Sequence, residues 1–145
     1  MRKTKVREVI LVDTGFWIAL LDPRDQHYHE AIGKEEWLDD AKIMVPWPIL
    51  YETVRTRLVR RPDRLVRFDR LLKRPQVFFL DDADFRVDAY ELSIEYSMNL
   101  GRPISMVDML CRLLIDDVNT RIDALLTTNP VDFRDVCERH GVIIL

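Results

Sequence analysis

Short apolar runs are the clearest pattern along the chain, and each has the length of one β-strand. Their residues are apolar at consecutive positions and rich in valine, isoleucine and leucine, which is typical of strands covered on both faces of a parallel sheet. The runs are residues 9–12, 43–45, 77–80, 124–126 and 142–145. The pattern therefore predicts a central, mainly parallel sheet of four or five strands.

Segments with helical periodicity separate most of these runs. They cover residues 14–22, a stretch from Ile49 that Pro62 interrupts, 63–72, 84–100 and 104–117, and a short helix is expected from Asn129-Pro130 onward. Strands that alternate with helices predict an α/β fold with helices on both faces of the sheet, a three-layer sandwich. No repeat, low-complexity tract or linker interrupts the pattern, so residues 1–145 are expected to form a single domain.

The composition is that of a globular protein, with 48% hydrophobic and 32% charged residues. No apolar run approaches the roughly 20 residues of a membrane span, and no signal-peptide core follows the first five residues. The two cysteines, Cys111 and Cys137, have no metal-ligand spacing. We therefore expect a cytoplasmic protein with reduced thiols and no membrane association.

The charge of the chain is unevenly distributed. Residues 55–74 carry nine basic and two acidic side chains, a net charge of +7, whereas the whole chain has a net charge of −3, which leaves −10 for the remainder. An acidic body with one basic segment indicates that a polyanion is handled near a cation-binding pocket. The alternative is a solvated pair of helices whose charges only face water.

Asp13 is an unusual residue at its position, because it separates the apolar run 9–12 from the apolar helix that follows. Ligands of parallel sheets bind beyond the carboxyl ends of the strands. Asp13 directly follows the first predicted strand, and residues 127–129 directly follow the fourth, so both should lie on the same rim of the sheet. Read alone, Asp13 is better explained as the N-cap of the helix that begins at Thr14.

Three further acids lie at comparable places, namely Glu52, Asp108 and Asp132. Each has a structural explanation of its own. Glu52 could pair with Arg55, and Ser105 with Asp108 or Asn129 with Asp132 could form a helix cap. Together, however, four carboxylates on one rim would repel one another and destabilise the fold. A divalent cation such as Mg²⁺ would resolve this repulsion and is suited to phosphodiester hydrolysis.

Four segments carry a resemblance to a known family. In order and spacing, "VILVDTGFWIALLD", "YETVRTRL", "ISMVDMLCRLL" and "LLTTNPVDF" resemble the four acidic motifs of PIN-domain ribonucleases. The segment "DQHYHEA" also looks like the family's stretch after the first helix. The resemblance spans almost the whole chain and is nearest to the small VapC-like toxins of prokaryotic toxin–antitoxin pairs.

The resemblance implies a Mg²⁺- or Mn²⁺-dependent endoribonuclease with a PIN-like fold. Its metal ligands and catalytic acids would be Asp13, Glu52 and Asp108, and either Asp132 or Asn129 would fill the fourth position. Polar side chains beside the metal would be those of Thr14, Ser105 and Thr128. The asparagine at position 129, where many relatives have aspartate, leaves open whether one or two metal ions bind.

The basic segment is then interpreted as the RNA-contacting surface, with phosphates approaching Arg57, Arg60, Arg61 and Arg64. By likeness to the family, we expect an RNA substrate, an antitoxin protein as partner, and a homodimer. The alternative is a catalytically silent module of the same fold that holds RNA or a protein partner. A phosphotransfer domain with Asp13 as nucleophile is disfavoured, because no second acid follows closely and no pocket lysine is evident.

Overall fold

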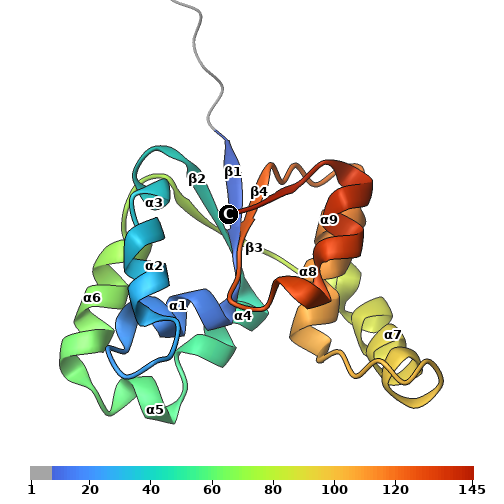
Figure 1. Ribbon diagram of the computed structural model, residues 1–145, viewed down its shortest axis with the longest axis horizontal. Coiled ribbons are helices and arrows are strands. Elements are labelled where there is room, and N and C mark those ends of the chain that lie inside the picture. Colours follow the sequence, from blue (N-terminus) through green and yellow to red (C-terminus); the bar gives the residue numbers. More distant parts are fainter. Residues whose placement is uncertain (1–7) are drawn as a thin grey trace, which may run out of the picture.

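The computed structural model describes residues 8–145 and has a five-stranded sheet at its centre (Figure 1). The strands are β1 (Val9–Val12), β2 (Lys42–Pro46), β3 (Val77–Leu80), β4 (Ala124–Leu126) and β5 (Ile143–Ile144). They run in the order β3-β2-β1-β4-β5, and every pair is parallel. The predicted α/β fold is confirmed, and within the described residues the sheet is parallel throughout.

Helices cover both faces of this sheet. One layer contains α1 (Thr14–Leu21), α2 (Tyr28–Lys34), α3 (Trp37–Asp40), α4 (Trp47–Thr53), α5 (Thr56–Val59) and α6 (Pro62–Leu72). The other layer contains α7 (Arg86–Met98), α8 (Met106–Asp116) and α9 (Arg134–His140), with the short 3₁₀ helices η1 (Ala83–Phe85) and η2 (Pro130–Asp132) before α7 and α9. The result is the predicted three-layer sandwich, seen edge-on in Figure 1.

The core lies against the central strand. All four residues of β1 are buried, as a strand covered on both faces requires. Trp17, on α1, is buried and packs edge-to-face against Phe68 of α6, with ring centroids 5.3 Å apart. No helix among the described residues combines the length and the apolarity needed to span a bilayer.

Two details of the helical pattern differ from the prediction. The stretch from Ile49 to Pro62 is not one helix, because α4 ends at Thr53, where Val54 has ψ of 54°, and α5 begins at Thr56. Thr53 donates from its hydroxyl to the carbonyl oxygen of Ile49 at 2.7 Å, a bond that competes locally with regular helix geometry. In addition, α2 and α3 were not predicted. Each buries a single residue, so neither has an apolar stripe to detect.

The carboxyl ends of the central strands form the rim on which the candidate site lies. The backbone N–H of Asp13 donates to the carbonyl oxygen of Leu126 at 2.9 Å, which continues the pairing of β1 and β4 by one residue. Asp13 and Thr127 therefore leave the sheet side by side, as the parallel topology predicts.

Candidate functional site

Among the four predicted acids, Asp13 accepts the most hydrogen bonds from described residues. Its Oδ1 accepts the backbone N–H of Thr14 at 2.8 Å, and its Oδ2 accepts the hydroxyl of Thr127 at 3.0 Å. The residue is 5% exposed. Asp13 is thus the N-cap of α1, one of the two roles expected for this residue. The hydroxyl of Thr127, directly after β4, also orients its carboxylate.

Thr127 is a residue that the sequence reasoning did not select. Besides donating to Asp13, its hydroxyl oxygen accepts the backbone N–H of Asn129 at 3.0 Å. Thr128, which was predicted to lie beside the metal, instead lies against Gly15. A Cβ atom added to Gly15 would come within 2.5 Å of the Thr128 hydroxyl. The register of two parallel strands could have distinguished the two threonines, because Val12 pairs with Leu126 and the next residues are Asp13 and Thr127.

Asp108 lies in the first turn of α8, on the opposite side of the rim. Ser105 is the N-cap of that helix, and its hydroxyl accepts the backbone N–H of Asp108 at 3.1 Å. The predicted cap therefore exists. Because this bond uses the backbone of Asp108, it leaves the carboxylate unpaired among the described residues and only partly buried.

The remaining predicted acids come from two further elements. Glu52, on α4, is half-buried and forms no ion pair with Arg55 in the described part of the chain. Asp132 closes η2, where its Oδ2 accepts the side-chain amide of Asn129 at 2.6 Å. Asn129 and Asp132 therefore contact one another directly, and neither is positioned independently of the other.

Electrostatics show that these four acids are neighbours. Burial raises the pKa of Asp13, and the charges of Glu52 and Asp132 raise it further, while the bonds from Thr127 and Thr14 lower it. Burial also raises the pKa of Asp108, to about 7, with contributions from the charges of Asp13, Asp132 and Glu52. A carboxyl group whose pKa is raised by burial and, in addition, by neighbouring carboxylates is typical of a functional site.

The fit of a metal ion can be judged from the donors. Within residues 8–145, no three Asp, Glu, His or Cys side chains are close enough to form a metal site as they stand. The donors nevertheless have the chemistry of a hard-cation site: mutually repelling carboxylates, and the hydroxyl of Thr14, which is buried and has no hydrogen-bond partner among the described residues. Oxygen donors of this kind suit Mg²⁺ and Mn²⁺.

Arg112 is a second residue that sequence reasoning missed. It lies one turn after Asp108 on α8 and is buried, although arginine rarely is. It donates to both carboxylate oxygens of Asp135, at 2.6 and 2.8 Å, and to the carbonyl oxygen of Asp132 at 2.7 Å. An arginine in the middle of an otherwise apolar helix, between Cys111 and Leu113, was the available signal, since such a charge needs a partner if it is buried.

The two cysteines give no nucleophile. Both are free and buried. Burial raises the pKa of the Cys111 thiol well above its ordinary value, and the nearby carboxylates of Asp13 and Asp108 act in the same direction. A thiol in this environment stays protonated, so the site's chemistry lies with its oxygen donors.

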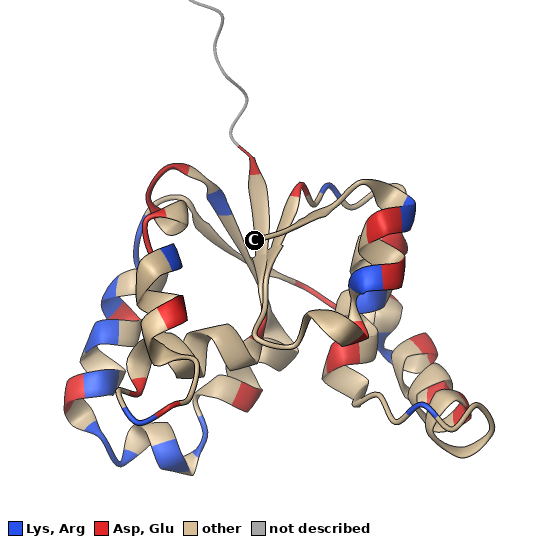
Figure 2. Ribbon diagram, in the orientation of Figure 1, with Lys and Arg blue, Asp and Glu red and all other residues tan. Residues whose placement is uncertain are grey.

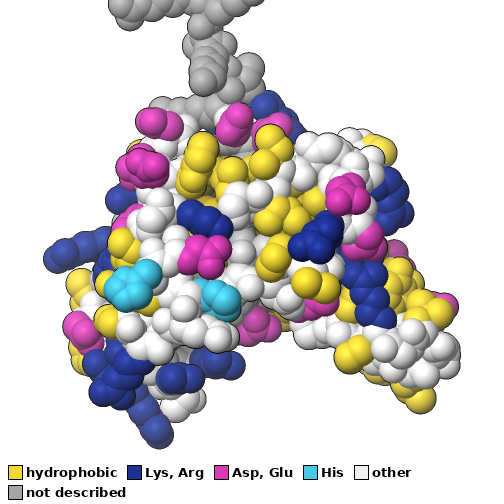
Figure 3. All heavy atoms as spheres, in the orientation of Figure 1, with side chains coloured by type: hydrophobic (Ala, Val, Ile, Leu, Met, Phe, Trp, Pro, Cys, Tyr) yellow, Lys and Arg dark blue, Asp and Glu magenta, His cyan; other side chains and the backbone are white. Residues whose placement is uncertain are grey.

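The basic segment forms α5 and α6, whose Lys and Arg positions lie at the lower left of the ribbon in Figure 2. Figure 3 shows Lys and Arg side chains gathered on the same part of the surface. The predicted RNA-contacting residues are not equivalent there. Arg57 and Arg64 lie 3.7 and 3.2 Å from the carboxylate of Asp22, and Arg61 lies 3.8 Å from that of Asp63. Arg60 is exposed and has no ion pair among the described residues.

Comparison with known proteins places this arrangement in context. The family model described as PIN domain matches residues 10–138. The structure is similar to that of VapC20 of Mycobacterium tuberculosis, described as a sarcin-ricin loop cleaving toxin: TM-score 0.59, 26% identity, 80% of this chain and 86% of that chain covered. No match was found among curated proteins.

A second solved structure has the same fold at lower sequence similarity. It is VapBC2 of Rickettsia felis bound to a DNA fragment from its promoter, with a TM-score of 0.60 and 14% identity over 94% of this chain and 97% of that chain. At this identity the likeness concerns the fold alone.

Proposed function

Because the chain belongs to the PIN domain family, we propose that it is a metal-dependent endoribonuclease that hydrolyses RNA phosphodiester bonds. The observation that carries the proposal is the group of four carboxylates that follow β1 or lie on α4, α8 and η2. Burial and the charges of the other three acids together raise the pKa of Asp108 to about 7. Such a group costs folding stability, and a bound cation offsets that cost.

In this proposal Asp13, Glu52 and Asp108 hold Mg²⁺ or Mn²⁺, and Asp132 or Asn129 completes the pocket. The bound ion supplies Lewis-acid polarisation of the phosphoryl oxygen and a water of lowered pKa. The chain's own contribution is to hold the ligands. Thr127 and the N–H of Thr14 orient the carboxylate of Asp13, and the Ser105 cap sets the start of the helix that carries Asp108.

The biological role we propose is that of a toxin from a toxin–antitoxin pair, with RNA as substrate and an antitoxin protein as partner. The similarity to VapC20, whose description names it a toxin that cleaves the sarcin-ricin loop, supports this role. The fit to both comparison structures covers four fifths or more of this chain, so the likeness concerns the whole fold rather than a fragment.

We further propose that the chain forms a homodimer through α7. The outward face of this helix carries Val87, Tyr90, Ile94 and Met98, which are 66%, 58%, 45% and 76% exposed. They recur at helical spacing and form one apolar stripe, of the kind that marks a protein–protein contact. Light scattering coupled to gel filtration should show a dimer for the wild type and a monomer for Ile94→Glu.

Cleavage assays test the enzymatic proposal. Wild-type protein should cleave single-stranded RNA with Mn²⁺, lose activity in EDTA and regain it when Mn²⁺ is restored. Asp13→Asn and Asp108→Asn should each lose most of the activity while remaining folded. The matched control is Glu95→Gln, an exposed acid on α7, which should behave as the wild type.

Equal cleavage by wild type and Asp108→Asn would refute the assignment. Calorimetric titration with Mn²⁺ then separates the enzyme from a silent module of the same fold. The enzyme should bind the ion saturably with loss of binding in Asp108→Asn, whereas absence of saturable binding by the wild type supports the silent module.

A further inference from the structure

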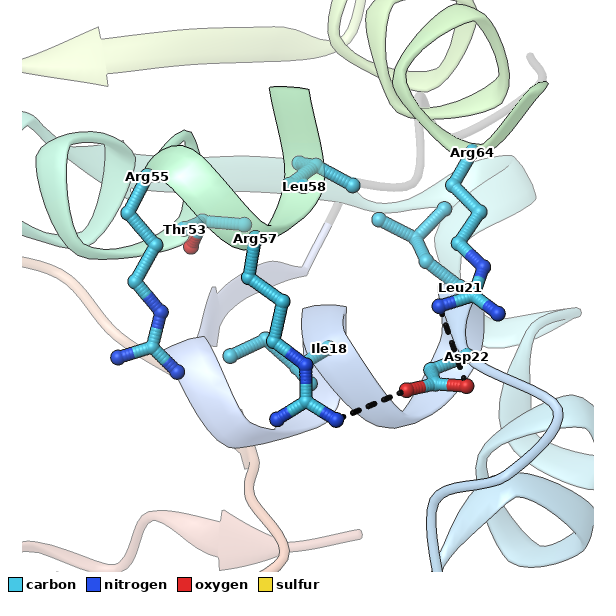
Figure 4. A pocket seen from close by; sticks show the side chains of 8 residues that line it. All are labelled: Ile18, Leu21, Asp22, Thr53, Arg55, Arg57, Leu58 and Arg64. Carbon is cyan, nitrogen blue, oxygen red and sulfur yellow. Dashed lines mark ion pairs between the residues drawn. The ribbon is translucent and has the colours of Figure 1, made fainter. Parts of the chain in front are cut away.

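A small, partly open pocket of about 30 Å³ lies at the C-terminal end of α1 (Figure 4). Its floor is apolar and includes Ile18 and Leu58, and its edge carries the side chains of Arg55, Arg57 and Arg64. A single carboxylate, that of Asp22, lies among them. The pocket therefore has an excess of positive charge at an edge that is open to solvent.

Asp22 is fully used within the protein. Its side chain is 9% exposed, its Oδ1 accepts the backbone N–H of Arg24 at 2.9 Å, and the same oxygen lies 3.2 Å from Arg64. Arg57 lies at 3.7 Å from the other oxygen and is 75% exposed, so this ion pair is loose. Asp22 thus holds Arg64 in place and leaves Arg57 free to contact a ligand.

The guanidinium groups of Arg55 and Arg57 keep their donors available, whereas that of Arg64 is paired with Asp22. The side chains of Arg55, Arg57 and Arg64 form no hydrogen bond with any described residue, and Arg55 also has no ion pair there. Arg67, one turn further along α6, shows the opposite case, because it donates to the carbonyl oxygen of Leu20 at 2.7 Å and to Glu35 at 2.8 Å. Guanidinium donors that line one pocket suit the recognition of a phosphate group.

The pocket and the carboxylate rim are joined by two helices. Asp13 caps the start of α1 and Asp22 caps its end, so about 12 Å of helix separates them, at about 1.5 Å per residue. Thr53, which also lines the pocket, directly follows Glu52 on α4. The pocket and the rim are therefore separated by no more than the length of one short helix.

We propose that this pocket binds a phosphate group of the RNA strand, away from the bond that is cleaved. Arg55 and Arg57 donate to the phosphate oxygens, and Arg64, held by Asp22, closes the far side. The inference rests on the proposed function and deepens it by assigning a place for the substrate backbone. It narrows the predicted set of RNA-contacting residues to Arg57 and Arg64, adds Arg55, and leaves Arg60 and Arg61 outside the pocket.

Binding measurements in EDTA test this inference without cleavage. The probe is a fluorescently labelled single-stranded RNA, followed by anisotropy at several salt concentrations. The pocket variant is Arg55→Gln/Arg57→Gln. The matched control is Arg60→Gln/Arg70→Gln, which removes the same charge from two exposed arginines that have no ion pair among the described residues.

We expect the pocket variant to lose at least about tenfold in affinity, and the slope of log K against log salt to fall by about 0.7 for each lost phosphate contact. The control should lose no more than about twofold. Equal losses in the two variants would mean that the basic surface acts through its overall charge, and no loss in the pocket variant would mean that the RNA lies elsewhere. Either result overturns the inference.

Two further binding experiments identify which group occupies the pocket. RNAs with one neutral methylphosphonate linkage, moved along the strand, should weaken wild-type binding at one position and leave the pocket variant unaffected. A poly-glutamate peptide serves as the protein-like competitor. If the peptide, and not RNA, depends on Arg55 and Arg57, the pocket belongs to an acidic protein partner and the inference is wrong.

Failure here is distinguishable from failure of the proposed function. If wild-type protein cleaves RNA and Asp108→Asn does not, while the pocket variant binds RNA as the wild type does, only the phosphate site is disproved. If Asp108→Asn cleaves normally, the nuclease assignment fails and the binding result remains valid.

Discussion

The guanidinium of Arg112 donates to the backbone carbonyl oxygen of Asp132 at 2.7 Å, which ties α8 to the segment after β4. The same guanidinium holds both carboxylate oxygens of Asp135, and these bonds keep the pKa of that carboxyl well below its usual range. Asp108 lies one turn before Arg112 on the same helix. The buried guanidinium of Arg112 therefore connects the helix that carries Asp108 to the backbone of Asp132. Arg112 is therefore a positioning residue for the candidate site.

Replacing Arg112 with methionine should destabilise the protein by about 1.5–3 kcal/mol, the range for hydrogen bonds that involve a charged group. The same substitution should weaken Mn²⁺ binding at temperatures where the variant is fully folded, because the backbone carbonyl of Asp132 loses its hydrogen bond from Arg112. Urea denaturation and calorimetric titration measure the two effects. Arg102→Met is the control, since Arg102 contacts the same residues only at 3.4 Å. Indistinguishable effects of the two substitutions would contradict the role of Arg112.

The pKa of Asp108 predicts how stability depends on pH. In the folded protein this pKa is about 7, above the ordinary value of 3.8, so the folded state binds more protons than the unfolded state between these values. The free energy of unfolding should therefore fall as pH rises from about 4 to about 7 in the absence of metal. Urea denaturation in EDTA from pH 5 to pH 8 measures this slope.

Asp108→Asn should flatten that slope and make the metal-free protein more stable than the wild type above pH 7. Mn²⁺ affinity of the wild type should rise over the same range, because binding requires the deprotonated carboxylate. Parallel stability curves for the two proteins would show that Asp108 does not carry the shifted pKa.

Thr127 and Thr128 offer a comparison between adjacent residues. Thr127→Val removes the hydroxyl that donates to Asp13 and accepts from Asn129, so Mn²⁺ affinity should fall by about tenfold or more. Thr128→Val, a change of the same size at a residue without these bonds, should alter the affinity little. Calorimetric titration measures both, and an equal loss in the two variants would refute the assignment of Thr127.

Asn129→Asp tests the fourth position of the site. Its side-chain amide donates to Asp132 at 2.6 Å, and an aspartate would place two carboxylates there instead. We expect the thermal midpoint in EDTA to fall and the increase on adding Mn²⁺ to become larger, because the cation then offsets the added repulsion. Asn119→Asp, an exposed position outside the site, is the control. An unchanged response to Mn²⁺ would place Asn129 and Asp132 outside the metal's reach.

The sheet was predictable because its strands are buried on both faces. Continuous apolar runs such as Val9–Val12 are possible only where helices cover the sheet on both sides, so this local pattern already contains the layer arrangement. Helices with little buried surface, α2 and α3, gave no comparable signal. The break between α4 and α5, at Val54, is likewise not revealed by the spacing of apolar residues.

The order of the four acidic segments, read from the sequence, was enough to indicate the family and the rim on which the acids gather. Tertiary structure alone decided which side chains orient them. Thr127 reaches Asp13 across 114 residues of chain, and Arg112 reaches Asp132 across 20. Hydrogen bonds act over about 3 Å, and such distances are set by strand register and helix packing, not by neighbourhood along the chain. For the same reason, the fold separates Arg57 and Arg64, which line a pocket, from Arg60, which faces solvent.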